Sequence, residues 1–160
     1  MATPKPFLHA AFLHELELFI AGGVRPASWS PALAGVLLTG GDDARPAPAA
    51  SHLIQLLHAR KAVLNAAFDT GQVADELRRY QKFVKPGRPS PHIVQLRQQQ
   101  AAARQASSQS RQLLIQSAAA FVRAAAIATP ARQTLEVFIE GWMDASLPQD
   151  GSPPNAGTAG

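Results

Sequence analysis

The sequence predicts an all-α fold, and three observations support that prediction. Ala and Gln, which lose little conformational freedom in a helix, make up much of the 160-residue chain. β-branched residues are scarce, so a large sheet has little support. Helix-start and helix-stop residues recur along the chain and divide it into five or six segments. One segment, about 91–128, is the longest and is predicted to be the spine of the fold.

The first two helices are bounded by the same pair of signals. Thr3-Pro4 predicts a start with Thr as the N-cap and Pro at the first helical position, and Gly22-Gly23 predicts the stop. Apolar residues cover most of this helix, which predicts that neighbouring elements surround it. Ser30-Pro31 opens a short second helix over 31–38, which Gly40-Gly41 ends.

Two further helices are predicted between two Pro-rich linkers, 42–48 and 86–91. The first covers about 49–67. Asp69–Gln72 resembles a capping box and opens the second, about 70–84. Two helices around a turn invite comparison with a DNA-binding helix-turn-helix whose recognition helix would be the second, although no sequence hallmark supports it.

Ser90-Pro91 starts the long helix, which carries a seven-residue repeat. Its seam positions are Ile93, Leu96, Gln100, Ala103, Ser107, Ser110, Leu114, Ser117 and Phe121. Small and polar residues in the middle predict close helix packing, either within the chain or across a dimer. Oligomerisation therefore stays open.

Thr129-Pro130 predicts the start of the last helix, which has a clean apolar face. That face comprises Leu135, Phe138, Ile139, Trp142 and Met143. Glu136, Glu140 and Asp144 lie opposite and predict a solvated face, or ion pairs with the basic residues of the long helix. Residues 147–160 are rich in Pro, Gly, Ser and Asn and predict a disordered tail, which leaves a single domain over 1–146.

Charge is distributed unevenly along the chain. Residues 51–132 hold twelve Lys or Arg against three acidic residues, a net charge of +9. The flanking segments 1–50 and 133–160 carry −1 and −4. No acidic residue occurs from His92 to Arg132. A basic block between acidic ends is typical of a surface that meets a polyanion.

Two groups within this block predict binding to nucleic acid. The first is the basic segment 78–88, with Arg78, Arg79, Lys82, Lys85 and Arg88. The second is Arg97, Arg104 and Arg111, two helical turns apart on one stripe. Tyr80 and Phe83 align with Leu77 at helical spacing and are predicted to face the core. The competing interpretation is a solvated helix face in the first group and a soluble spacer helix in the second.

An alternative function is a protein-interaction module, such as an adaptor or small chaperone of a larger assembly. The long helix and the last helix would then carry the contacts, through Leu114, Phe121, Phe138 and Trp142. An oligomer that dissociates on substitution of these residues, without affinity for nucleic acid, would favour this alternative.

Several kinds of chemistry find no support in the residues. The chain has no Cys, which excludes disulfides, thiolate metal sites and cysteine catalysis. The five His are not spaced for a metal site, and no phosphate loop or nucleophile elbow occurs. The most apolar run, 113–128, is short for a membrane span and contains Arg123. We therefore expect a non-enzymatic cytoplasmic protein without metal, cofactor or identified small-molecule substrate.

Overall fold

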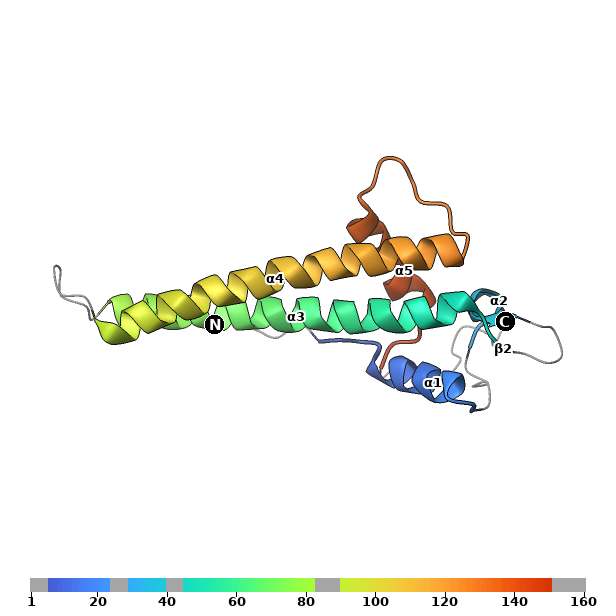
Figure 1. Ribbon diagram of the computed structural model, residues 1–160, viewed down its shortest axis with the longest axis horizontal. Helices are drawn as coiled ribbons and strands as arrows, with labels where there is room; N and C mark the ends of the chain where they lie inside the picture. The colour runs from blue at the N-terminus through green and yellow to red at the C-terminus, as the bar shows by residue number, and fades with distance from the viewer. Residues whose placement is uncertain (1–5, 24–28, 40–44, 83–89, 151–160) are drawn as a thin grey trace. The chain divides into compact units, whose positions relative to one another are not determined.

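The computed structural model describes residues 6–23, 29–39, 45–82 and 90–150, and within these ranges the all-α prediction is confirmed (Figure 1). Five helices are present: α1 Ala10–Ile20, α2 Pro31–Leu37, α3 Pro48–Gln81, α4 Pro91–Ala124 and α5 Leu135–Ser146. Two short strands, β1 Leu38–Thr39 and β2 Arg45–Pro46, pair antiparallel with Leu38 opposite Pro46. No helix in the described residues is both long and apolar enough to cross a membrane.

The chain divides into two compact units. The hairpin unit comprises residues 1–7 and 59–113, and the core unit comprises residues 8–58 and 114–160. Helices α3 and α4 each contribute one part to either unit. The single domain over 1–146 stays a prediction, and the predicted disorder of 151–160 lies outside the described residues.

Helix α1 ends where the sequence predicts but begins later. The Gly22 amide donates to the Phe19 carbonyl and the Gly23 amide donates to the Leu18 carbonyl. Gly22 adopts φ of +106°, so this end is a Schellman motif that glycine allows without steric cost. The start predicted at Thr3-Pro4 is wrong, because residues 6 and 7 are irregular and 8 and 9 form a turn. A contact from the far end of the chain caps the true start: the Ala11 amide donates to Asp150 Oδ1 at 3.0 Å.

Helix α2 confirms its predicted cap, since Ser30 Oγ accepts the Leu33 amide at 3.2 Å and Pro31 is the first helical residue. The strand pair β1–β2 follows and was not predicted. The second strand lies in the middle of the predicted linker 42–48, of which residues 42–44 lie outside the described residues.

Helix α3 is one continuous helix, so the predicted division into 49–67 and 70–84 is wrong, as is the helix-turn-helix comparison. Inside the helix, Thr70 Oγ1 donates to the Ala66 carbonyl at 2.8 Å. The Thr70 hydroxyl, next to the predicted cap residue Asp69, therefore bonds one turn back along the same helix. Gly71 lowers helix propensity by about 1 kcal/mol, which packing against α4 offsets.

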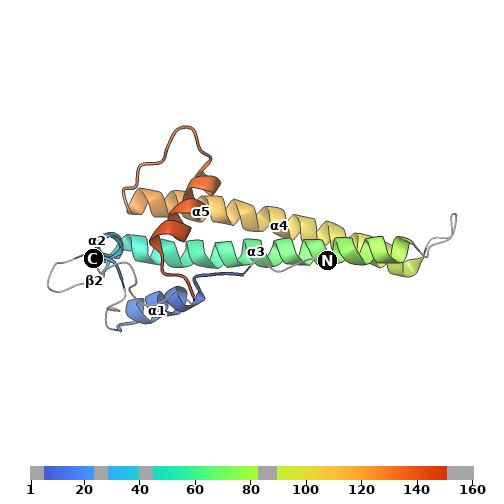
Figure 2. The same ribbon diagram turned by 180° about the vertical axis from the view of Figure 1, so that it is seen from behind.

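In the hairpin unit, α3 and α4 pack side by side and run in opposite directions (Figures 1 and 2). Thr70 Oγ1 also lies 3.5 Å from the Ala103 carbonyl, and Leu77 clusters with Ile93, Leu96 and Val73. Every predicted seam position of α4 in this unit is buried or half-buried. The seam therefore closes within the chain here, through small residues that allow the two backbones to approach.

The connection from α4 to α5 is longer than predicted. Helix α4 ends at Ala124 rather than 128, and Ala126 adopts φ of +56° as the Ile127 amide donates to the Val122 carbonyl. Thr129-Pro130 does not start α5, so that prediction is wrong. Thr134 is the N-cap instead, and its Oγ1 accepts the Val137 amide at 3.3 Å. Glu136 in the first turn adds a favourable interaction with the helix dipole.

The core unit holds most of the large buried side chains. Trp29 contacts the rings of Phe12 and Phe19, with centroids 5.9 and 5.4 Å apart. Other fully buried residues are Leu16, Leu37, Leu53, Leu56, Leu57, Leu114, Phe121, Ile139 and Met143. Leu18 of α1 is 54% exposed, so that helix is not covered on all sides as predicted.

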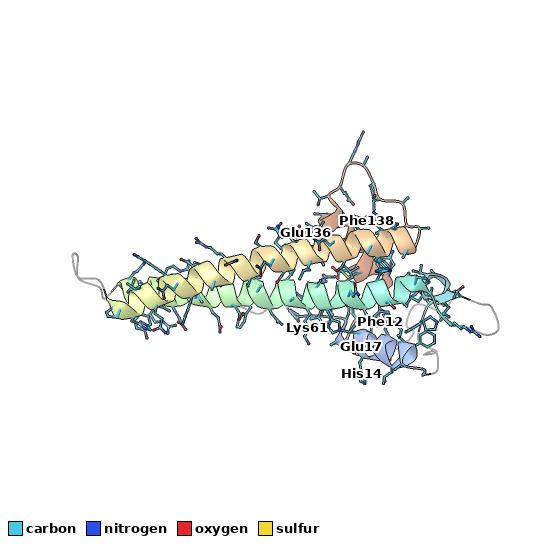
Figure 3. All side chains as sticks on the ribbon, in the orientation of Figure 1. Phe12, His14, Glu17, Lys61, Glu136 and Phe138 are labelled. Atoms are coloured by element: carbon cyan, nitrogen blue, oxygen red, sulfur yellow. The ribbon has the colours of Figure 1, made fainter. Side chains whose placement is uncertain are left out.

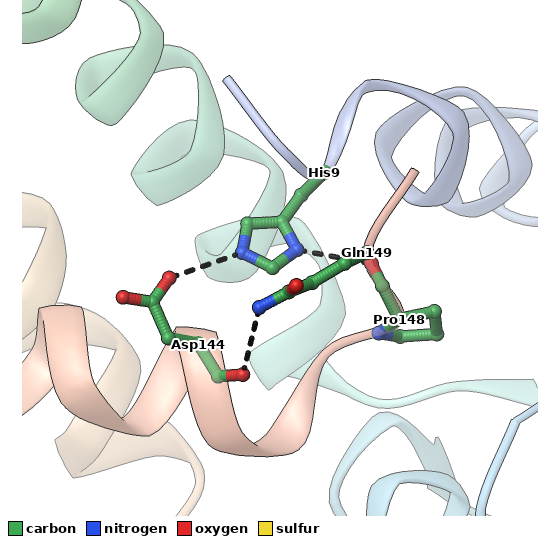
Figure 4. A network of polar contacts seen from close by, with 4 residues as sticks. All are labelled: His9, Asp144, Pro148 and Gln149. Carbon is green, nitrogen blue, oxygen red and sulfur yellow. Dashed lines mark hydrogen bonds and ion pairs between the residues drawn. The ribbon is translucent and has the colours of Figure 1, made fainter. Parts of the chain in front are cut away.

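Residues 147–150, the start of the predicted tail, belong to the described residues and contact the start of α1; Figure 4 shows Pro148 beside His9. Leu147 is buried, and the Asp150 amide donates to the Leu8 carbonyl at 2.6 Å. His9, only 1% exposed, has Nδ1 3.0 Å from the Pro148 carbonyl and Nε2 3.5 Å from Asp144 Oδ1. The segment after α5 is thereby fastened to the start of α1.

Candidate nucleic-acid interface

The uneven distribution of charge along the sequence corresponds to a charge difference between the two units. The hairpin unit holds eleven Lys or Arg against three acidic residues, a net charge of +8. The core unit holds four against eight, a net charge of −4. A polyanion would therefore be attracted to the hairpin unit and repelled by the core unit.

Arg97, Arg104 and Arg111 of α4 are all exposed. Each follows directly after a seam position, so the three lie along one edge of the α3–α4 contact, about 10 Å apart along the helix. Arg111 has a further contact within the chain. We call this edge the arginine flank.

The corresponding edge of α3 is mostly made of uncharged residues. In an antiparallel helix pair, the flank of α4 that follows its seam residues lies beside the equivalent flank of α3. That flank of α3 holds Arg60 and Arg78 and otherwise Leu, Ala, Gly and Gln. Asp69 and Glu76 fall at positions that face the opposite flank. Asp75, one helical turn before Arg78, is the acidic residue of α3 that reaches this flank through its ion pair with Arg78.

The basic end of α3 is only partly as predicted. Arg78, Arg79 and Lys82 are exposed, but Arg78 forms an ion pair with Asp75, one helical turn earlier. This pair reduces the charge that Arg78 presents to a ligand. Lys85 and Arg88 lie outside the described residues.

Tyr80 does not face the core, so that prediction is wrong. It is 42% exposed, while Leu77 one turn earlier is buried. Its ring meets the ring of His92 edge-on, with centroids 4.4 Å apart and planes at 77°. The helix ends soon after Tyr80, so few residues of α4 remain to cover it. The role of His92 was missed, because only the antiparallel register brings it to Tyr80. Phe83 lies outside the described residues.

The four residues of the protein-interaction alternative differ in accessibility. Leu114 and Phe121 are fully buried within this chain, so neither offers a surface to a partner of the folded protein. Phe138 of α5, labelled in Figure 3, is half-buried, and so is Trp142. The centroid of the Trp142 ring lies 5.0 Å from that of Phe121. The apolar face of α5 is thus largely used inside the core unit.

The acidic stripe of α5 is less solvated than predicted. Glu136 and Glu140 are half-buried, and Glu136 has a contact within the chain. Asp144 is exposed and lies beside the buried His9 ring. Within the described parts of the chain, no three His, Asp or Glu side chains gather as a metal site would require.

Comparison with known proteins adds no relative: no family model, curated protein or solved structure matches the chain.

Proposed function

We propose that this protein is a non-enzymatic accessory protein that binds nucleic acid through the arginine flank and the basic end of α3. One observation carries the proposal: three exposed arginines lie in a row along one side of α4, within a unit whose net charge is +8. The guanidinium fork of Arg suits phosphate oxygens, and each neutralised phosphate releases counterions. Contacts of this kind position a protein on the backbone without reading the sequence.

The row spans about 21 Å along α4, because each residue rises 1.5 Å. Such a length suits an extended polyanion better than a single phosphate group. The net charge of +8 on the hairpin unit adds long-range attraction, which raises the association rate at low salt. We also expect a cytoplasmic location, which cell fractionation would test.

The test is a titration of nuclease-treated protein against labelled duplex and single-stranded DNA and RNA at about 50 and 200 mM salt. We expect affinity to fall steeply with salt, with a log–log slope of roughly −3 or steeper when three or more phosphates are contacted. The same slope should become shallower by about one for each arginine removed from a phosphate contact.

Charge-reversal variants sharpen the test. The triple variant Arg97→Glu, Arg104→Glu, Arg111→Glu should lower affinity by at least about tenfold at the lower salt concentration. The matched control is Arg45→Glu, Arg123→Glu, Arg132→Glu, which changes net charge equally at three exposed positions of the core unit. Absence of binding at low salt, or equal losses in both triple variants, would refute the proposal.

A further inference from the structure

The exposed ring pair at the end of the hairpin has no role in the proposed phosphate contacts. Tyr80 lies next to the last residue of α3, and His92 is the second residue of α4. Both rings are exposed. Their edge-on contact joins the last turn of α3 to the first turn of α4.

The geometry of this pair leaves flat aromatic surface open. In an edge-on contact, one ring presents its rim to a single face of the other. The contact therefore uses one of the four faces that two rings possess. With Tyr80 42% exposed and His92 also exposed, aromatic faces remain accessible from solvent.

Cations stand close to these rings in the sequence. Arg79 directly precedes Tyr80 and Lys82 follows two residues later, and both are exposed. The end of α3 therefore combines an exposed ring pair, on which unpaired bases can stack, with positive charge that can neutralise the phosphates of the same strand.

We propose that the Tyr80–His92 pair binds an unpaired base of single-stranded nucleic acid by stacking, an inference that rests on the proposed function. In a duplex, both faces of each base are covered by the neighbouring base pairs, so stacking on Tyr80 requires an unpaired base. The arginine flank then supplies affinity for any strand, and the ring pair supplies preference for single strands.

The probes are a single strand of about 12 nucleotides, an abasic strand with the same number of phosphates, and a duplex of equal length. One stacked base should make the base-containing strand bind about 5- to 100-fold tighter than the abasic strand. Tyr80→Leu, which keeps a helix-compatible apolar side chain, should abolish this ratio and leave abasic binding unchanged. Tyr80→Phe keeps the ring and should preserve the ratio.

The chain contains a single Tyr, which allows a direct readout in the intact protein. Incorporation of 3-fluorotyrosine gives one fluorine resonance, which reports on the surroundings of Tyr80. We expect this resonance to shift on addition of the base-containing strand and to stay in place with the abasic strand or the duplex.

The outcomes separate this inference from the proposed function. Equal affinity for base-containing and abasic strands in the wild type overturns the stacking role and leaves the phosphate contacts standing. Absence of binding to all three probes overturns both. A Tyr80→Leu variant that melts at a lower temperature but keeps the wild-type ratio shows that the ring pair only closes the hairpin, which also overturns the inference.

Discussion

The hairpin unit and the core unit use the same two long helices, α3 and α4, but pack them differently. In the core unit the seam of α4 presents Leu114 and Phe121, which are fully buried. In the hairpin unit it presents the buried Ile93 and Leu96 at the start of α4, and then the half-buried Gln100, Ala103 and Ser107. Small seam residues let two helices pack while most of each helix surface stays in solvent. The chain places its excess positive charge on that exposed surface.

The largest expected effect tests the large-residue packing of the core unit. Phe121→Ala removes a fully buried ring that contacts Trp142, and should lower the free energy of unfolding by about 3–5 kcal/mol. Chemical denaturation followed by circular dichroism measures this loss. Leu113→Ala, at a 56% exposed position of the same helix, is the control and should change stability by no more than about 0.5 kcal/mol. Similar losses in both variants would refute the core assignment.

The next effect tests the continuity of α3 in the hairpin unit. Gly71→Pro removes an amide hydrogen bond inside the helix and clashes with the preceding turn, so it should cost about 3 kcal/mol or more. Thermal and chemical unfolding both measure the loss. Gly71→Ala, which keeps the amide, should be neutral or stabilise by up to about 1 kcal/mol. If Gly71→Pro leaves the stability unchanged, residues 69–72 form a turn. The two units would then not share one continuous helix α3.

A smaller effect tests how the core unit closes on its C-terminal segment. Asp150→Ala removes the acceptor for the Ala11 amide and should cost about 1 kcal/mol, as loss of a helix cap does. Asp150→Asn keeps a side-chain oxygen and should cost less. Amide exchange at the start of α1 should speed up in the Ala variant and not at the seam of the hairpin unit. An unchanged exchange rate at Ala11 would contradict the cap.

The smallest expected effect comes from a substitution that gives the hairpin unit a large seam residue like those of the core unit. The pairing of Thr70 with Ala103 places Gln100 opposite Val73. Gln100→Leu puts a large apolar residue into the small-residue seam and should stabilise the hairpin unit by about 1 kcal/mol or less. Gln99→Leu, at the exposed neighbouring position, should give no gain. An equal gain at position 99 would mean that helix propensity, and not the seam, is responsible.

Local signals in the sequence located most helix ends. Ser30-Pro31, Gly22-Gly23 and Ser90-Pro91 all act as predicted, because caps and stops depend on the hydrogen bonds of neighbouring residues. The failures share another cause. Asp69–Gln72 has the composition of a helix start, yet the helix runs through it, because packing along α4 outweighs the local preference.

Some features of the candidate site could likewise be predicted from local sequence, whereas others depend on tertiary contacts. Exposure of the arginine row follows from its spacing beside the seam, so the sequence was sufficient to predict the stripe. The ion pair of Arg78 with Asp75 is local, but the contact of Tyr80 with His92 depends on the antiparallel register. A single sequence does not reveal that register, since seam residues this small specify it weakly.

The sequence by itself determined the helical class, the principal caps and the separation of basic from acidic residues, because these follow from backbone propensity and composition. The tertiary structure decided what joins residues far apart in the chain. The Asp150 cap on α1, the burial of His9 beside Pro148 and the continuity of α3 all depend on such contacts. Their free energies arise from packing and hydrogen bonding between distant segments, which local preference does not contain.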